Sequence, residues 1–144
     1  MKVVVQRARN ARCIVKGQTV SKIDNGLLVL VGFTNQDTEE EITYLVKKIV
    51  NLRIFANENQ VMDLSVKDVN GQILCISQFT LYANTKKGNR PSYVAALNPQ
   101  DAKKLYDLFL EKLKVYVPTK AGVFGAHMDI EFTNDGPVTI IMER

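Results

Sequence analysis

Several residue types are scarce in this chain, and each scarcity excludes a class of protein. The 144 residues include two cysteines, one histidine and no tryptophan. Cys13 and Cys75 lie inside apolar segments, which is typical of reduced proteins rather than of a disulfide scaffold. The single histidine, His127, cannot form a multi-histidine zinc site, and the cysteine spacing matches no metal motif. We therefore expect a mechanism that uses no metal ion.

Long apolar runs and nucleotide-binding loops are also missing. No stretch approaches the about 20 apolar residues that a membrane span requires, so we expect a cytoplasmic protein without a membrane anchor. Neither a glycine-rich dinucleotide loop nor GxxxxGK occurs, and no cofactor is predicted. The net charge of +4 permits an anionic partner such as nucleic acid without requiring one.

What remains fits one domain over residues 1–144, because 46% of the residues are hydrophobic and 24% are charged. Strands are predicted over 2–8, and over 12–15 and 19–23 around a turn at Lys16-Gly17. The apolar run 26–33 is bounded by glycine and predicts a central strand.

Two amphipathic helices are predicted. Thr38 and Glu41 form a capping box before apolar residues at helical spacing, which are Ile42, Leu45, Val46, Ile49 and Val50. Asn98-Pro99 begins the second helix, whose apolar stripe contains Ala102, Leu105, Leu108, Phe109 and Leu113. Further strands are expected near 60–66, 73–82, 127–133 and 138–142, with a turn at 134–137. This order predicts an α/β domain with a mixed, largely antiparallel sheet and two main helices.

The segment SQFTLY, residues 77–82, places polar side chains where a buried strand favours apolar ones. In a strand through residue 82, Gln78 and Thr80 would share a face with Ile76, while Ser77 and Phe79 would point the other way. Threonine has high β propensity and glutamine suits an exposed strand end, so these residues alone leave a purely structural role open.

Other candidate residues are ambiguous by themselves. The sequence contains no GxSxG motif, so there is no serine nucleophile for which His127 could act as the base. The apolar neighbours of Cys75 favour a place in the core. Lys86, Lys87 and Arg90 form either a solvated turn or a phosphate contact. Gly136-Pro137 is either a chain reversal or a cis peptide whose neighbouring carbonyl oxygens form a rigid acceptor pair.

Two motifs taken together resemble a known family. SQFTLY at 77–82 and NDGPVT at 134–139 are similar to the signature motifs of the D-aminoacyl-tRNA deacylases, which hydrolyse D-amino acids from mischarged tRNA. The opening MKVVVQR, the strand 26–32, KGNRPS at 87–92 and Phe124-Gly125-Ala126 extend the resemblance along the chain. Ala121-Gly122 departs from it, because many relatives have Thr-Gly there.

The resemblance implies a homodimer with active sites at the subunit interface, which acts on the acceptor end of aminoacyl-tRNA and proofreads translation. Ser77, Gln78, Phe79 and Thr80 are expected to hold the terminal adenosine and the ester. Gly136 and Pro137, in cis, are expected to check chirality in the pocket of the other subunit. Three further roles are implied: Arg7 orients the Gly-Pro carbonyls, Phe124 and Met128 line the pocket, and Lys86, Lys87 and Arg90 lie near tRNA phosphates.

An aminoacyl ester is already activated, so positioning it beside water and stabilising its oxyanion needs no strong nucleophile. A threonine nucleophile and a route assisted by the ribose 2′-hydroxyl are both open, and the lack of a base near Thr80 favours the second. Two other functions compete: a noncatalytic module that binds a tRNA end, and a cysteine or serine hydrolase of small esters.

Overall fold

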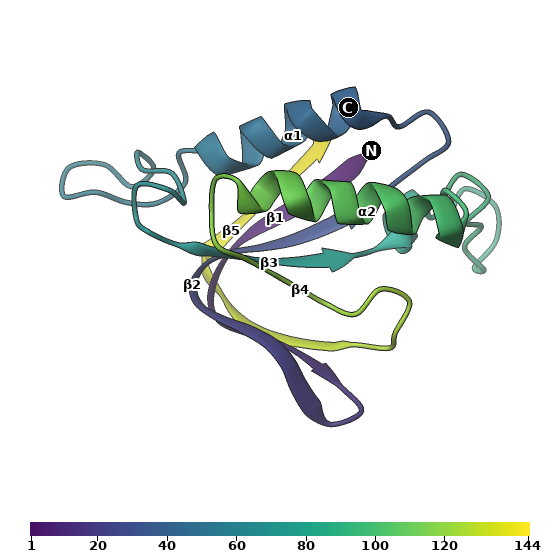
Figure 1. Cartoon of the computed structure of the whole chain (residues 1–144), viewed down its shortest axis with the longest axis horizontal. Coiled ribbons are helices and arrows are strands. Elements are labelled where there is room, and N and C mark those ends of the chain that lie inside the picture. The colour runs from purple at the N-terminus through teal and green to yellow at the C-terminus, as the bar shows by residue number, and fades with distance from the viewer.

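Five strands form one mixed sheet, and two helices lie side by side on one of its faces (Figure 1). The computed structural model describes residues 1–144. The strands are β1 (Lys2–Val15), β2 (Gln18–Gly32), β3 (Gln72–Ser77), β4 (Thr119–Ala121) and β5 (Asp129–Glu143), in the order β4-β3-β2-β1-β5. The pairs β1–β2 and β1–β5 are antiparallel and long, whereas β2–β3 and β3–β4 are parallel and short. The predicted single α/β domain with a mixed sheet is confirmed.

The first two strands form one long hairpin that curls away from the helices (Figure 1). Its turn is at Lys16-Gly17, where φ is 49° and 77°, as the sequence predicts. The predicted strands 2–8 and 12–15 are parts of the single strand β1, and 19–23 is continuous with 26–32 in β2. They are continuous because β1 and β2 pair with each other from end to end. The apolar run 26–33 forms the second half of β2, as far as Gly32, between β1 and β3, and its position in the sheet is confirmed.

Both helices begin at the predicted caps. The capping box before α1 (Glu39–Asn51) is present: Thr38 Oγ1 accepts the Glu40 N–H at 3.2 Å, and the Glu41 carboxylate accepts the Thr38 N–H at 2.8 Å. Asn98 caps α2 (Pro99–Lys114) by accepting the Asp101 N–H at 3.0 Å. Of the predicted stripe, Phe109 and Leu113 are buried, and Ala102, Leu105 and Leu108 are partly buried against the core. Tyr106 and Leu110 are buried as well, although they were not predicted.

The strand predicted near 60–66 is wrong. Only an isolated bridge between Phe55 and Leu64 forms there. The Asn57 side chain accepts the N–H groups of Asn59 and Gln60, both at 2.7 Å. Such local bonds stabilise a turn in place of a ladder.

The strand predicted through residue 82 is also wrong, because β3 ends at Ser77 and a 3-10 helix, η1 (Phe79–Tyr82), follows. The Gln78 N–H makes a last bond to the Val31 carbonyl at 2.7 Å, and β2 ends one residue later. On the other side β4 reaches only Cys75. With no neighbouring strand left, the backbone satisfies its polar groups in a helical turn.

The turn predicted at 134–137 is instead a bulge within a single strand, β5. Gln6 pairs with Thr139 and Ala8 pairs with Asn134, so residues 135–138 face only Arg7. An insertion of this size bends the strand and aims its residues away from the ladder. Gly136-Pro137 therefore protrudes from the sheet edge and does not reverse the chain.

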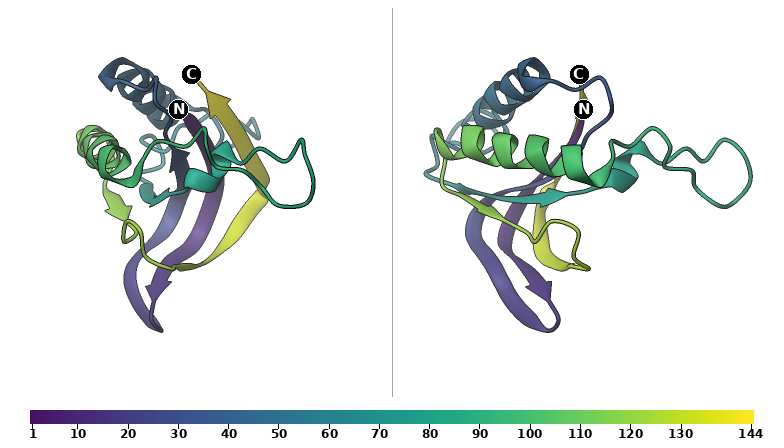
Figure 2. Two further views of the ribbon diagram at one scale, coloured as in Figure 1. Left: turned by 90° about the vertical axis from the view of Figure 1, so that its right-hand side faces the viewer. Right: turned by 45° about the vertical axis from the view of Figure 1, so that its right-hand side comes forward.

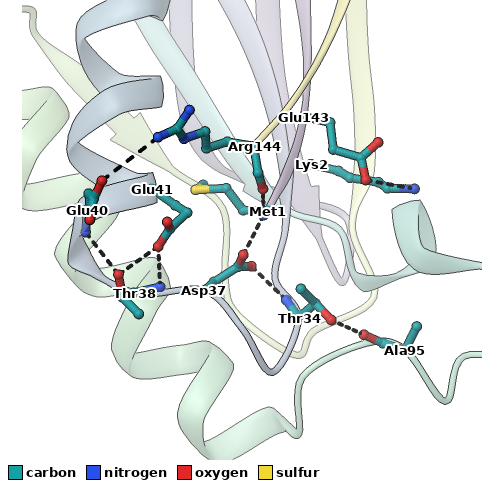
Figure 3. A network of polar contacts seen from close by, with 10 residues as sticks. All are labelled: Met1, Lys2, Thr34, Asp37, Thr38, Glu40, Glu41, Ala95, Glu143 and Arg144. Atoms are coloured by element: carbon teal, nitrogen blue, oxygen red, sulfur yellow. Dashed lines mark hydrogen bonds and ion pairs between the residues drawn. The ribbon is translucent and has the colours of Figure 1, made fainter.

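The N-terminus contacts the loop that precedes α1, and the C-terminal residue bonds to the N-terminus (Figure 3). The Met1 ammonium donates to Asp37 Oδ1 at 2.5 Å and to the Arg144 carbonyl at 2.8 Å. Asp37 Oδ2 accepts the Thr34 N–H at 2.7 Å, and the Thr34 hydroxyl donates to the Ala95 carbonyl at 2.7 Å. This network fixes the segment around Ala95 against the end of β2.

The segment 83–97 contains no helix or strand, as predicted, and its first part projects from the body (Figure 2). Asn84 and Ser92 close the base of this loop through two backbone bonds of 2.8 and 3.0 Å. Neither α1 nor α2 is long and apolar enough to cross a membrane.

Candidate active site

A cavity of about 590 Å³ opens at the carboxyl ends of β2 and β3, beside the start of α2. Ser77, Gln78 and Phe79 form one wall, where the chain passes from β3 into η1. Phe124 and Met128, from the segment between β4 and β5, form another. The cavity is mostly apolar and is lined by a few polar residues, which is the usual character of a small-molecule site.

Most of the predicted pocket residues are brought together, and Thr80 is the exception. Thr80 does not line the cavity, although Ser77, Gln78, Phe79, Phe124 and Met128 do. Its hydroxyl oxygen accepts a hydrogen bond from Gln78 Nε2 at 2.5 Å. Thr80 is therefore linked to the cavity through its hydrogen bond with the Gln78 amide.

Aromatic side chains lie at the mouth of the cavity. The Phe79 and Tyr93 rings meet edge to face with centroids 5.1 Å apart, and Phe79 is 56% exposed. A flat exposed ring of this kind can stack on a nucleobase. Tyr93 follows the KGNRPS stretch directly and was not predicted as a site residue.

His127 lies at the rim, and its side chain is 95% exposed. Its Nε2 is 3.7 Å from Asp129 Oδ1, beyond hydrogen-bonding distance. A general base is normally held in orientation by a third group. The surface position of His127 agrees with its predicted lack of a catalytic role.

Neither cysteine has the surroundings of a nucleophile. Both are free and fully buried, and burial raises the pKa of the Cys75 and Cys13 thiols. A thiol with a raised pKa remains protonated and unreactive at neutral pH. Neither cysteine lines the cavity, and the structure gives no support to the cysteine hydrolase alternative.

The bulge on β5 is held by Arg7. Arg7 Nε donates to the Asp135 carbonyl at 3.1 Å and lies 3.0 Å from Asp135 Oδ2, while Arg7 Nη1 donates to the Ile54 carbonyl at 2.8 Å. The Gly136-Pro137 peptide bond is cis. Gly136 has φ +123°, and a Cβ on it would lie 3.0 Å from Arg7 Nη2. Gly136 and Pro137 do not line the cavity of their own chain.

Lys86, Lys87 and Arg90 lie exposed on the projecting loop. The loop that carries them follows η1 directly, and Phe79 at the start of η1 lines the cavity. Figure 2 shows this loop projecting from the body. A positive loop beside an aromatic-rimmed cavity suits a negatively charged polymer whose end enters the cavity.

Tyr106 was missed as a residue near the site. It lies beside Leu105 in the predicted stripe of α2, but the sequence does not show that its hydroxyl reaches the Cys75 carbonyl at 2.8 Å. The side chain is 2% exposed, and its ring packs against Phe124 with centroids 5.7 Å apart.

Comparison with known proteins identifies the family. The model of the family described as D-Tyr-tRNA(Tyr) deacylase matches residues 4–143. A solved structure described as c-Myc DNA Unwinding Element Binding Protein is 44% identical, with a TM-score of 0.94, covering 100% of this chain and 99% of that chain. A second, a probable eukaryotic D-amino acid tRNA deacylase, shares the fold at 18% identity, with a TM-score of 0.83, covering 98% of this chain and 97% of that chain. The chain therefore belongs to the D-Tyr-tRNA(Tyr) deacylase family, whose members are ester hydrolases that act on D-aminoacyl-tRNA.

Proposed function

We propose that this enzyme, working in the cytoplasm, removes D-amino acids and glycine from the 3′ end of tRNA, spares L-aminoacyl-tRNA and so proofreads translation. The observation that carries the proposal is the pairing of two features in a chain of this family. One is an apolar cavity edged by Ser77, Gln78 and Phe79. The other is a protruding Gly136-Pro137 bulge whose backbone is fixed by Arg7.

In the proposed complex, the terminal adenosine and the aminoacyl ester occupy the cavity. Ser77 and Gln78 contribute polar groups, Phe79 contributes an exposed ring, and Phe124 and Met128 form the apolar wall. Thr80 holds the Gln78 amide in position. No cofactor is required by this chemistry.

We further propose that the enzyme is a homodimer in which the bulge of one subunit enters the cavity of the other. The protruding position of the bulge supports this, as does its absence from the cavity of its own chain. Carbonyl oxygens of Gly136 and Pro137 can then accept hydrogen bonds from the substrate ammonium and collide with an L side chain. Glycine has no side chain to collide, so its ester is hydrolysed together with D esters.

Hydrolysis proceeds by attack of water on the ester carbonyl, and the ribose 3′-oxygen leaves with a proton. The ribose 2′-hydroxyl helps to activate the water in this scheme, because the Thr80 hydroxyl bonds to the Gln78 amide and not to a base of the protein. Backbone N–H groups of Phe79 and Thr80 precede the first bond of η1, from Leu81 N to Gln78 O, and are suited to stabilise the oxyanion.

The proposal predicts a characteristic selectivity. Purified wild-type protein treated with EDTA is expected to deacylate D-Tyr-tRNA and Gly-tRNA, with kcat/KM for L-Tyr-tRNA at least about 100-fold lower, since the excluded side chain must collide with fixed backbone. Single-turnover release of each labelled amino acid measures this. Rapid release from L-Tyr-tRNA would overturn the carbonyl gate, and failure to discharge any of the three would favour the noncatalytic RNA-binding alternative.

The projecting loop predicts a salt effect. Replacing Lys86, Lys87 and Arg90 together by alanine is expected to weaken binding of every aminoacyl-tRNA and to reduce the slope of log K against log salt by about 2–3, since each lost phosphate contact removes about one released counterion. Binding measured between low and moderate salt tests this. The matched control replaces Lys16, Lys22 and Lys114, which are also exposed, and should leave the slope unchanged. Equal slopes in both triple variants would show that the loop is a solvated turn that makes no phosphate contact.

A further inference from the structure

One carbonyl oxygen joins three elements behind the cavity. The Cys75 carbonyl, in β3, accepts the Gly122 N–H at 3.0 Å and the Tyr106 hydroxyl at 2.8 Å. Cys75 precedes the wall residue Ser77 by two positions, and Gly122 likewise precedes Phe124. Two walls of the cavity are therefore connected, through backbone two residues away, to a shared atom, which Tyr106 connects to α2.

The same tyrosine also supports a wall directly. Its ring packs against the Phe124 ring at an interplanar angle of 41°, and Phe124 lines the cavity. Burial raises the pKa of the Tyr106 hydroxyl, so it remains a hydrogen-bond donor over the working pH range.

Little free space remains around this junction. A Cβ on Gly122 would lie 2.6 Å from Met128 Sδ and 2.8 Å from Ile76 Cδ1. In such packing, a shift of Tyr106 is transmitted to the wall and is not absorbed locally.

We propose that Tyr106 is a positioning residue for deacylation, which sets the separation of the Ser77 wall from the Phe124 wall and thereby the placement of the ester. This inference rests on the proposed function, because it assigns the ester to this cavity. Tyr106 touches no substrate, and it acts through the Cys75 carbonyl and the Phe124 ring.

Tyr106→Phe tests the hydroxyl alone, because the ring remains and Gly122 still satisfies the Cys75 carbonyl. We expect kcat for D-Tyr-tRNA to fall about tenfold with KM within about twofold, since misplaced reacting groups lower the rate while contacts with the remaining tRNA maintain binding. Tm should fall by only about 3–6 °C, as for one lost hydrogen bond. The control, Tyr116→Phe, changes a tyrosine that is 45% exposed and should leave kcat and Tm unchanged.

A second measurement separates positioning from plain stabilisation. If Tyr106 acts through the wall, Phe124→Leu should lose much less activity in the Tyr106→Phe background than in the wild type. A lower Tm with unchanged kcat, or fully additive losses, would overturn the inference while leaving the proposed function intact.

Hydrogen exchange supplies a readout that is independent of activity. Tyr106→Phe should speed amide exchange in residues 122–128 without changing exchange in α1. If the wild type discharges no tRNA, the proposed function fails, and with it the assignment of Tyr106 to ester placement. Unchanged exchange in residues 122–128 would show that Tyr106 does not hold the Phe124 wall, and would overturn the inference.

Discussion

Replacing Arg7 by alanine is expected to lower kcat/KM for D-Tyr-tRNA by about 100-fold and to reduce the preference for D over L, because imprecise placement at a reacting centre carries a penalty of this size. Arg7 makes the bonds to Asp135 and Ile54 that hold the bulge, and its side chain is only 12% exposed. Without it, the backbone of Gly136 loses the contacts that hold it, and the proposed carbonyl gate would have no fixed position. Parallel assays with D-Tyr- and L-Tyr-tRNA measure both effects.

Arg9 offers a matched control for this experiment. Its guanidinium lies 3.0 Å from the other carboxylate oxygen of Asp135, but Arg9 is 57% exposed and makes a surface ion pair. Such pairs contribute about 0–1 kcal/mol, so Arg9→Ala should keep nearly full activity and selectivity. Arg7→Lys, which retains the charge without the planar fork, should fall between the two. Equal losses from Arg7→Ala and Arg9→Ala, or an unchanged D/L ratio, would contradict the role of Arg7.

Gly26→Ala is expected to destabilise the fold by more than about 4 kcal/mol, or to abolish soluble expression, because neither the backbone angle nor the space admits a side chain. Gly26 has φ +145°, and a Cβ there would lie 1.9 Å from the Gln72 carbonyl oxygen and 2.6 Å from the Gln72 nitrogen. Both atoms belong to the backbone of β3, which pairs with β2 at this residue. Relief requires separation of the two strands whose ends form the cavity.

Gly17 provides the comparison, since it also has positive φ, at +77°, but a Cβ there meets nothing within 4 Å. Gly17→Ala should therefore cost only the backbone term of about 1–2 kcal/mol. Urea unfolding of the wild type and the two variants gives the free energies of unfolding. Similar values for the two alanine variants would show that β2 and β3 can separate at Gly26 without penalty.

Features determined by neighbours in sequence were predictable. The capping box at Thr38, the cap at Asn98 and the hairpin turn at Lys16-Gly17 depend on side chains and backbone angles within a few residues. The central strand was also predictable, since burial on both faces requires a continuous apolar run.

Features determined by distant partners were not predictable. Where β3 ends depends on where β2 and β4 stop, and both are remote in sequence. The bulge at 135–138 depends on its register against Arg7, about which periodicity in the segment itself carries no information.

The candidate site likewise contains residues that could be predicted from the sequence and residues that could not. The motif resemblance placed Ser77, Gln78 and Phe79 in a pocket, and the structure locates them together at one cavity. It did not indicate that Thr80 reaches this cavity only through Gln78. Tyr106 could not be found either, because its hydroxyl partner lies 31 positions away in the chain.

The parallel pairing of β2 with β3 has a practical consequence for handling the molecule. Both helices return the chain to the start of the next parallel strand, so the cavity and the projecting loop lie at one end, and the segments after α1 and α2 lie at the other (Figure 1). The turn at 57–60 is part of that distant end and is closed by its own asparagine. A fluorophore or surface tether attached at the exposed Glu58 would leave the cavity of its own chain unobstructed, and this is the position we favour for single-molecule measurements.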